Sequence, residues 1–276
     1  MNAWISAAGW SATGPVRVSN DDHYCVGPIV EQPGRTTLAI ESDSMHFQSY
    51  GFLAAVADGM GGYAGGAAAS RLVLDVLAAQ FYGERRHPTG DATAEQIARY
   101  VEQARQTLSE ALRRRPELGD AGTTLAGIVL ARPDILVVFH VGDSRVLRAS
   151  GGFVRGLTVD HSVVAADVAC GRLSEDDAVS VPGGDALTRS LGLRGNGAPE
   201  IQVFSAWEPG DCFLIGTDGW HGLGRGLSRL ALRQWLTDDP EPERLVERMI
   251  EAAGKADGQD NASVVVVVVG GERSAV

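Results

Sequence analysis

Residues 55–70 read AVADGMGGYAGGAAAS, and the interpretation of the whole chain starts from this stretch. The segment 51–57 is short and apolar, which is typical of a buried strand. A helix is predicted over about 66–81, because apolar residues there fall on one face, namely Leu72, Val73, Val76 and Leu77. Between them stand Asp58 and a run of glycines, which let the backbone approach a bound group closely. Asp58 is therefore predicted at the rim of a sheet, within reach of a ligand or an ion.

Three interpretations of this junction are open: a plain strand-to-helix loop, a dinucleotide site or a metal site. Gly59, Gly61 and Ala64 match the loose form of the dinucleotide fingerprint. That fingerprint also requires an acid at the end of the next strand, about 20 residues on, and Asp75 lies within the predicted helix instead. A metal site requires further carboxylates elsewhere in the chain.

Composition limits the class of protein. The chain has 276 residues, a net charge of −11 and a pI near 5.0, so we expect no nucleic-acid partner. Lys255 is the only lysine and follows no Walker pattern, which excludes a P-loop nucleotide site. No run of 18 apolar residues and no basic-then-apolar leader occurs, so neither a membrane span nor a signal peptide is expected. The 3 cysteines form no motif, which favours a reducing, cytoplasmic setting.

Short strand-like runs joined by tight turns predict antiparallel pairing. They cover residues 4–10, 24–27, 36–40, 51–57, 124–130, 135–141, 146–149, 201–204, 212–216 and 263–269. The valines of 264–269 are typical of a strand buried on both faces. Further helices are predicted over about 92–114 and 241–253. We therefore expect an α+β fold with helices packed outside two antiparallel sheets.

Residues 157–195 differ from the rest, because they predict short helices and no long strand. We interpret them as an insertion, or flap, within a single domain that covers residues 1–270. Residues 271–276 are expected to form a loose C-terminal tail.

Other acidic residues end or interrupt strands as Asp58 does, namely Asp21, Asp22, Asp143, Asp218 and Asp260. An isolated loop aspartate is usually a turn former or a cap. Here, however, the pairs Asp58-Gly59 and Asp218-Gly219 both close apolar strands. Hard cations such as Mg²⁺ and Mn²⁺ take oxygen ligands, whereas the 6 histidines show no ligand spacing, which disfavours zinc. The carboxylates together predict a magnesium or manganese site.

In its order of motifs the chain resembles the metal-dependent protein phosphatase family of the protein phosphatase 2C type, in its bacterial form. The matching segments cover about residues 5 to 270 and are VRVSNDDHY, VADGMGGYAGGAAAS, AGTTLAGIVL, VGDSRVLRAS, LTVDHSVV with LTRSLG, GTDGW and DGQDNASVVVV. Any one of these motifs is weak, but all of them in the family order are very specific. The resemblance implies a central β-sandwich flanked by helices on both sides, a four-layer α-β-β-α fold, with a two-metal site at one end.

The resemblance also assigns roles by position. Asp58 would bridge two divalent cations, Mn²⁺ or Mg²⁺, and the Gly59 carbonyl would complete one of them. Asp218 and Asp260 would hold the second cation, and Asp143 would join Asp218 at a third, weaker site. Asp21 stands where the family usually has glutamate and would reach the first cation through water. Its neighbour Asp22 would be a further ligand. Arg17 matches the arginine that binds the substrate phosphate.

The activity that the resemblance implies is hydrolysis of phosphoserine and phosphothreonine by attack of a metal-bridging hydroxide, with no phosphoenzyme. The expected partners are a phosphorylated protein and a bacterial serine/threonine kinase that the enzyme opposes, and the expected state is a monomer. Asp21 and Tyr63, which replaces a histidine often seen after GMGG, leave an alternative open. In it, the chain is a catalytically weak or inactive member of the fold that acts as a partner-binding regulatory module.

Other phosphatase mechanisms do not match. Cysteine-based phosphatases need Cys-x₅-Arg, and no arginine stands at that spacing from Cys25, Cys170 or Cys212. Calcineurin-like enzymes begin with Asp-x-His, which residues 21–23 match, but they also need a later Gly-Asn-His, which is absent. Aspartyl-phosphate enzymes would require Asp-x-Asp after an early strand, and this is absent as well.

Overall fold

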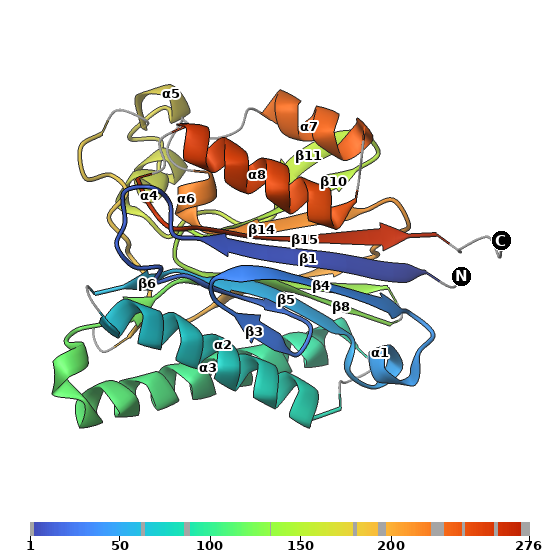
Figure 1. The fold of residues 1–276 in the computed structure, drawn as a ribbon, viewed down its shortest axis with the longest axis horizontal. Helices are drawn as coiled ribbons and strands as arrows, with labels where there is room; N and C mark the ends of the chain where they lie inside the picture. The colour runs from blue at the N-terminus through green and yellow to red at the C-terminus, as the bar shows by residue number, and fades with distance from the viewer. Residues whose placement is uncertain are drawn as a thin grey trace.

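The computed structural model describes residues 3–61, 64–85, 89–132, 134–178, 181–192, 197–221, 229–238, 241–256 and 259–271. Within these ranges, two 6-stranded antiparallel sheets lie face to face between outer layers of helices, as Figure 1 shows. The predicted four-layer α-β-β-α sandwich of the α+β class is confirmed. Among the described helices, none is both long and apolar enough to cross a membrane.

The first sheet joins the two ends of the chain. β1 (Trp4–Ala12) pairs with β15 (Ala262–Gly270) so that Trp4 lies opposite Gly270 and Ala12 opposite Ala262. This register brings the loop after β1 beside the turn before β15. The strand order is β11 (Phe153–Gly156), β10 (Arg145–Ser150), β14 (Cys212–Gly216), β15, β1 and β4 (Gly34–Glu41).

The second sheet places two acidic motifs side by side. His23 lies opposite Ala57, so the Asp21-Asp22 pair before one strand adjoins Asp58 after the other. The strand order is β13 (Glu200–Ser205), β9 (Ile135–Val141), β8 (Leu125–Ala131), β5 (Phe52–Ala57), β2 (His23–Val26) and β3 (Ile29–Glu31).

A small third sheet extends the sandwich at this end, in the order β12 (Leu191–Gly192), β7 (Gly122–Thr123) and β6 (Gly59–Met60). Gly59 pairs with Thr123 and Met60 with Gly122. Residues 59–60, which the sequence predicts as part of a turn, are therefore a short strand. Two residues are too few to show a strand periodicity, so only the pairing partner reveals it.

The valine run of β15 shows how the core is divided. Val265, Val267 and Val269 face the second sheet and belong to the core between the sheets. Val264, Val266 and Val268 point the other way, into the core beneath α8 (Pro242–Ala256). Both faces are buried because a sheet lies on one side and a helix on the other, as predicted.

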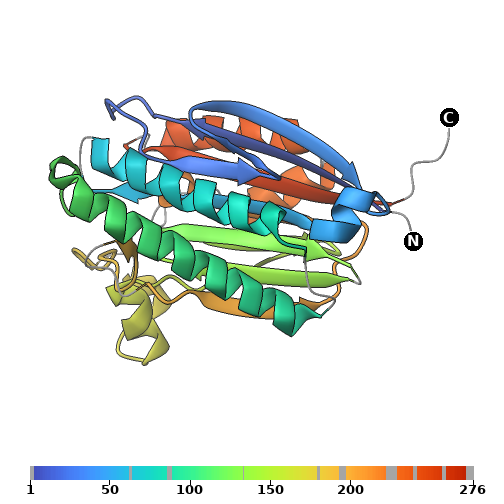
Figure 2. The ribbon, with the colours of Figure 1, turned by 90° about the horizontal axis from the view of Figure 1, so that it is seen from below.

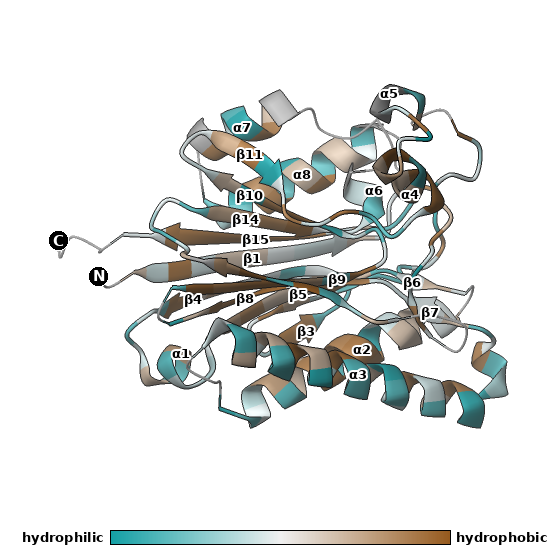
Figure 3. Ribbon diagram, turned by 180° about the vertical axis from the view of Figure 1, so that it is seen from behind, coloured by the Kyte–Doolittle hydropathy of each residue, from teal (hydrophilic) through white to brown (hydrophobic). Residues whose placement is uncertain are grey.

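Two long helices cover the second sheet, and shorter helices lie outside the first (Figures 1 and 2). α2 (Ala64–Gly83) and α3 (Gly90–Arg114) bury Val73, Leu77, Ile97 and Val101 against the sheet. Figure 3 shows that the strands between the two layers of helices are mainly hydrophobic. Leu72 and Val76 are only partly buried but pack against the same core. On the other side, α8 covers β1 and β15, and the shorter α6 (Asp218–His221) and α7 (Arg229–Asp238) complete that layer.

Several short elements are absent from the sequence-based prediction. α1 (Met45–Tyr50), β3 and β11 are brief or exposed, and the periodicity that predicts longer elements is too short to read in them. α7 is amphipathic and buries Leu232, and it is a further helix that the sequence-based prediction does not contain. A 3₁₀ turn, η1 (Pro116–Leu118), follows α3.

The flap contains only short elements in its described part, in agreement with the prediction. These are α4 (Val163–Ala169), α5 (Glu175–Ala178) and β12. Residues 179–180 and 193–195 of the flap, residues 272–276 of the predicted tail, and Tyr63 lie outside the described residues.

Candidate metal centre

Asp58 stands between β5 and β6, at the end of the sandwich where the small third sheet begins. Its N–H donates to Thr124 Oγ1 over 3.0 Å. Its carbonyl accepts from the Thr124 N–H at 2.9 Å and from Thr123 Oγ1 at 2.8 Å. The Asp58 backbone is therefore anchored to the segment that leads into β8, which fixes the origin of the carboxyl group.

The Asp58 carboxyl lies among other acids. Burial raises its pKa well above the ordinary value, and the negative charges of Asp22, Asp218 and Asp143 add to this effect. The Asp58 and Asp218 carboxyl groups lie close enough to act on each other directly, and burial together with this proximity favours a proton on the pair. Residues from four separate segments of the chain thus meet around Asp58.

Asp218 is the first residue of α6, directly after β14 and Thr217. Its Oδ1 atom is buried and has no hydrogen-bond partner among the described residues. Burial, followed by the charge of Asp260, raises the pKa of Asp218. Leaving a buried acceptor without a donor costs about 1–3 kcal/mol, so this oxygen is well suited to coordinate a cation.

Asp143 lies in the turn between β9 and β10. Burial raises its pKa to about 7, and the charges of Asp218 and Asp160 contribute in the same direction. The structure therefore brings Asp143 to the same group as Asp58 and Asp218, on the side that faces the start of the flap.

Asp22 is only 1% exposed and connects the acidic segments. Thr217 Oγ1 donates to Asp22 Oδ2 over 2.8 Å, and the Ser263 side chain, whose hydroxyl donates to Ser11 Oγ over 2.7 Å, lies near the same carboxyl. Burial raises the pKa of Asp22 to about 7 despite these hydrogen bonds, and the nearby charges of Asp218 and Asp260 add to the effect. The predicted ligand Asp22 thus also links the segments that carry the other acids.

Asp21 is held through its backbone. Its N–H donates to Asn261 Oδ1 over 2.8 Å, and its carbonyl accepts from Ser70 Oγ at 2.6 Å. Ser19 Oγ donates to Asp21 Oδ1 over 3.2 Å. Asn261 and Ser70 were not identified from the sequence, although each stands inside a quoted motif, DGQDNAS or GGAAAS.

Gly59 is required by close packing. A Cβ atom at this position would collide with the carbonyl oxygens of Gly66 and Asp21. A Cβ atom on Gly66 would in turn lie 2.8 Å from the Gly59 carbonyl oxygen and 3.0 Å from Asp21 Oδ2. The family resemblance assigns the Gly59 carbonyl as a metal ligand. The structure adds that α2 approaches β6 and Asp21 too closely for any side chain.

Arg17 and Asp260 form an ion pair at the edge of the acidic group. Arg17 Nη2 donates to Asp260 Oδ2 over 2.6 Å, and Arg17 Nε donates to the Gln259 carbonyl over 3.2 Å. Their side chains are 54% and 39% exposed, so substrate can reach them. The hydrogen bond and charge of Asp260 raise the pKa of Arg17, and the charges of Asp58 and Asp218 contribute further.

The donor set fits hard divalent cations. It offers carboxylate oxygens from separate segments, a buried oxygen without a donor, and acids whose pKa values are raised by burial and by one another's charge. Oxygen ligands of this kind suit Mg²⁺ and Mn²⁺. A divalent cation offsets the negative charge and favours the ionised carboxylates.

The chain is similar in sequence to known protein phosphatases. The family model described as protein phosphatase 2C matches residues 40–267. The chain is 29% identical to the protein phosphatase PhpP of Streptococcus pneumoniae over 255 residues, 92% of this chain and 93% of PhpP. It is 32% identical to the serine/threonine protein phosphatase PstP of Mycobacterium tuberculosis, over 79% of this chain but only 40% of PstP.

Solved structures show the same likeness. The crystal structure of the serine/threonine phosphatase PstP/Ppp of Mycobacterium tuberculosis superimposes with a TM-score of 0.78 at 28% identity, covering 97% of this chain and all of that one. The catalytic domain of PstP in complex with 2 manganese ions superimposes with a TM-score of 0.74 at 27% identity, covering 98% of this chain.

Proposed function

The chain belongs to the protein phosphatase 2C family and is a metal-dependent protein serine/threonine phosphatase, and we propose that the aspartates at the end of its β-sandwich form the active centre. One observation carries this assignment. Asp218 Oδ1 is buried without a donor among the described residues, within a group of carboxyls whose pKa values are raised by burial and by one another's charge. Bound cations would satisfy the oxygen and relieve the repulsion.

In this proposal, Asp58, Asp218 and Asp260 are the main ligands of two cations, Mn²⁺ or Mg²⁺, and the Gly59 carbonyl is a further ligand. Asp58 would help to hold both cations, a role supported by its position among acids from several segments. Asp21 and Asp22 complete this set, with Asp22 also holding Thr217 in place. Asp143 and Asp218 hold a third, weaker cation.

When bound, divalent cations lower the pKa of water towards neutrality and offset the charge of the phosphoryl oxygens. The chain itself supplies orientation. Arg17 has a planar guanidinium that can donate two parallel hydrogen bonds to a phosphoryl group. Asp260 and the Gln259 carbonyl hold this guanidinium at the edge of the acidic group. A phosphoryl group bound by Arg17 would therefore lie beside the cations that Asp58 and Asp218 would hold.

The cysteines do not support a covalent mechanism. Cys25 and Cys212 are buried, and burial raises the pKa of Cys25 to about 12 and that of Cys212 further still. A thiol with such a pKa is not a nucleophile at neutral pH. Cys170 is exposed but lies at the end of α4 in the flap.

The substrate is a phosphorylated protein. We propose further that the cognate partner is a bacterial serine/threonine kinase whose products this enzyme dephosphorylates, and that the enzyme acts as a monomer in the cytoplasm. Residues 1–270 would form one catalytic domain that includes the flap. The unpaired cysteines support the reducing compartment.

The direct test uses p-nitrophenyl phosphate and a phosphothreonine peptide. Purified protein with Mn²⁺ should hydrolyse both, and EDTA should stop the reaction. The inactive partner-binding alternative predicts a folded protein that binds Mn²⁺ but turns over neither substrate. The similarity to named phosphatases does not favour that alternative.

A further inference from the structure

The turn that carries Asp143 is held on both sides by two consecutive residues at the start of the flap, Asp160 and His161. The Gly142 N–H donates to His161 Nδ1 over 3.1 Å, and the His161 N–H donates to the Gly142 carbonyl over 2.9 Å. Arg145 donates two hydrogen bonds to the Asp160 carboxylate, at 2.8 and 2.6 Å. Asp143 therefore lies between two fixed points.

Gly142 makes this contact possible. Its φ angle is +103°, a conformation that a side chain disfavours, and a Cβ atom would lie 2.6 Å from Thr124 Cγ2. On the far side of Asp143, the Ser144 hydroxyl hydrogen-bonds Thr124 Oγ1 at 2.7 Å. The same Thr124 oxygen accepts from the Asp58 N–H, so the turn is anchored to the Asp58 segment as well.

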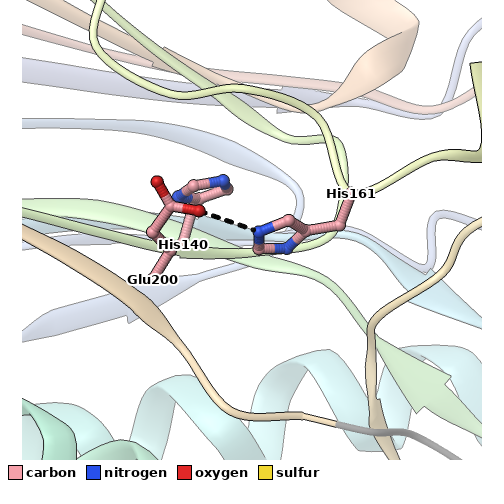
Figure 4. A group of neighbouring side chains, drawn as sticks. All are labelled: His140, His161 and Glu200. Atoms are coloured by element: carbon pink, nitrogen blue, oxygen red, sulfur yellow. Dashed lines mark hydrogen bonds and ion pairs between the residues drawn. The ribbon is translucent and has the colours of Figure 1, made fainter. Parts of the chain in front are cut away.

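His161 is 7% exposed and belongs to a compact group with His140 and Glu200, drawn in Figure 4. The two imidazole rings stack with centroids 4.3 Å apart and an interplanar angle of 16°. His161 Nε2 lies 3.5 Å from Glu200 Oε2, and His140 Nε2 lies 2.8 Å from the Val159 carbonyl oxygen. These contacts fix the His161 ring, so that its Nδ1 faces Gly142.

Ligand atoms of His140, His161 and Glu200 lie within 4.8 Å of one another, although the sequence shows no metal-ligand spacing of histidines. Two observations argue against a cation here. Gly142 already donates to His161 Nδ1, so the neutral ring carries its proton on Nε2. Arg189 Nη1 also lies 3.2 Å from that Nε2 and would repel a cation. The group is better explained as a support for His161.

The backbone at His161 also pairs with residues 186–188, which follow α5 in the flap. The Thr188 N–H donates to the His161 carbonyl over 2.8 Å, and the neighbouring Ser162 forms a β-bridge with Leu187. The Val163 N–H donates to the Ala186 carbonyl over 3.0 Å. The two ends of the segment that includes α4 and α5 therefore close on the residue that holds Gly142.

From these contacts we infer that His161 is a positioning residue for the third cation site. His161 places Asp143 by holding the neighbouring Gly142. Because residues 186–188 bind His161 and its neighbours, the placement of Asp143 also depends on the contact between the two ends of this flap segment. The inference rests on the proposed function, because it takes Asp143 as a ligand. His161 itself touches neither the reacting atoms nor the cations.

The test compares His161→Leu with His161→Asn. Leucine has a similar size but no acceptor, whereas the asparagine Oδ1 can accept from Gly142 in place of Nδ1. Mn²⁺ binding is measured by the electron paramagnetic resonance of the free ion, without any substrate. We expect His161→Leu to weaken the weakest Mn²⁺ site by about tenfold, the effect of one buried N–H left unpaired, and His161→Asn to stay within about twofold of the wild type.

Two further variants complete the comparison. Asp143→Asn marks the weakest site, since it should remove the same binding step that His161→Leu weakens. His46→Leu is the matched control, because His46 lies in α1 at the opposite end of the sandwich (Figure 1). All three Mn²⁺-binding steps of this variant should equal those of the wild type. If His161→Leu yields too little folded protein, His161→Ala removes the acceptor without adding methyl groups and should weaken the same step.

The possible outcomes distinguish a failure of the role of His161 from a failure of the proposed function. Equal weakening of all sites in His161→Leu, no weakening, or an asparagine variant as weak as the leucine variant would overturn the role of His161 while the proposed function stands. A wild-type protein that binds no Mn²⁺ or hydrolyses no phosphoester would overturn the proposed function itself.

Discussion

The Arg17 guanidinium donates a 2.6 Å hydrogen bond to Asp260, so the predicted phosphate-binding group and a predicted metal ligand contact each other directly. The two residues are 243 positions apart and meet because β1 pairs with β15. A cation bound by Asp260 would weaken this ion pair, and a phosphoryl group would bind the guanidinium that the ion pair holds in place. Metal binding and substrate binding are therefore expected to affect each other at this contact.

Arg17→Ala should lower kcat/KM for a phosphothreonine peptide by about 10- to 100-fold, mainly through a higher KM, because charged hydrogen bonds to the phosphate are lost. Arg17→Lys should recover only part of the loss, since an ammonium cannot pair bidentately. Arg99→Ala is the control, because Arg99 forms an exposed ion pair with Glu84 on the outer helices. Equal kinetics for Arg17→Ala and wild type would remove Arg17 from the site.

Asp58→Asn should reduce hydrolysis of p-nitrophenyl phosphate by at least about 10³-fold, because the central ligand loses its charge. In EDTA, the same variant should melt at least about 2 °C higher than the wild type, because folding no longer has to protonate a carboxyl whose pKa is raised by burial and by the neighbouring acids. Activity and melting temperature thus change in opposite directions. Wild-type rates in a folded variant would contradict the assignment of Asp58.

Gly59→Ala should destabilise the protein by about 1–3 kcal/mol in urea unfolding and lower activity, because the new methyl group collides with the carbonyls of Gly66 and Asp21. Gly254→Ala is the matched control in α8, where a Cβ atom meets nothing within 4 Å. There, alanine should stabilise the protein by up to about 1 kcal/mol through helix propensity. If Gly59→Ala changes the free energy of unfolding no more than Gly254→Ala does, the close contact between α2 and β6 is contradicted.

Stability without cations should fall as pH rises. The pKa values of Asp22 and Asp143 are raised to about 7 in the folded chain, from 3.8 for an unperturbed aspartate. The folded state therefore binds more protons than the unfolded state. The contribution of these two carboxyls to the free energy of unfolding is fully present below about pH 4 and is lost as pH rises through about 7.

The measurement is the melting temperature in EDTA at about pH 5 and about pH 8. We expect the lower value at the higher pH, and Mn²⁺ should reverse the difference because cations bind the ionised carboxylates. A melting temperature in EDTA that rises over this range would contradict the raised pKa values.

Local patterns in the sequence determined much of this protein. The valines of 264–269 predicted a strand buried on both faces, and the structure confirms this strand between the second sheet and α8. The apolar runs that end in Asp58 and Asp218 placed both acids at strand ends, where the structure has them. Such features are readable because side-chain periodicity and strand termination depend on neighbouring residues.

Only the tertiary structure decided which distant groups meet. The Thr217 hydroxyl binds Asp22, Arg17 pairs with Asp260, and His161 holds Gly142. Each of these contacts depends on strand register and on the closure of two sheets over one core, which no local pattern encodes. The chain order of the motifs predicted a common site, but the hydrogen bonds that hold each acid in it arise only when the sandwich is assembled.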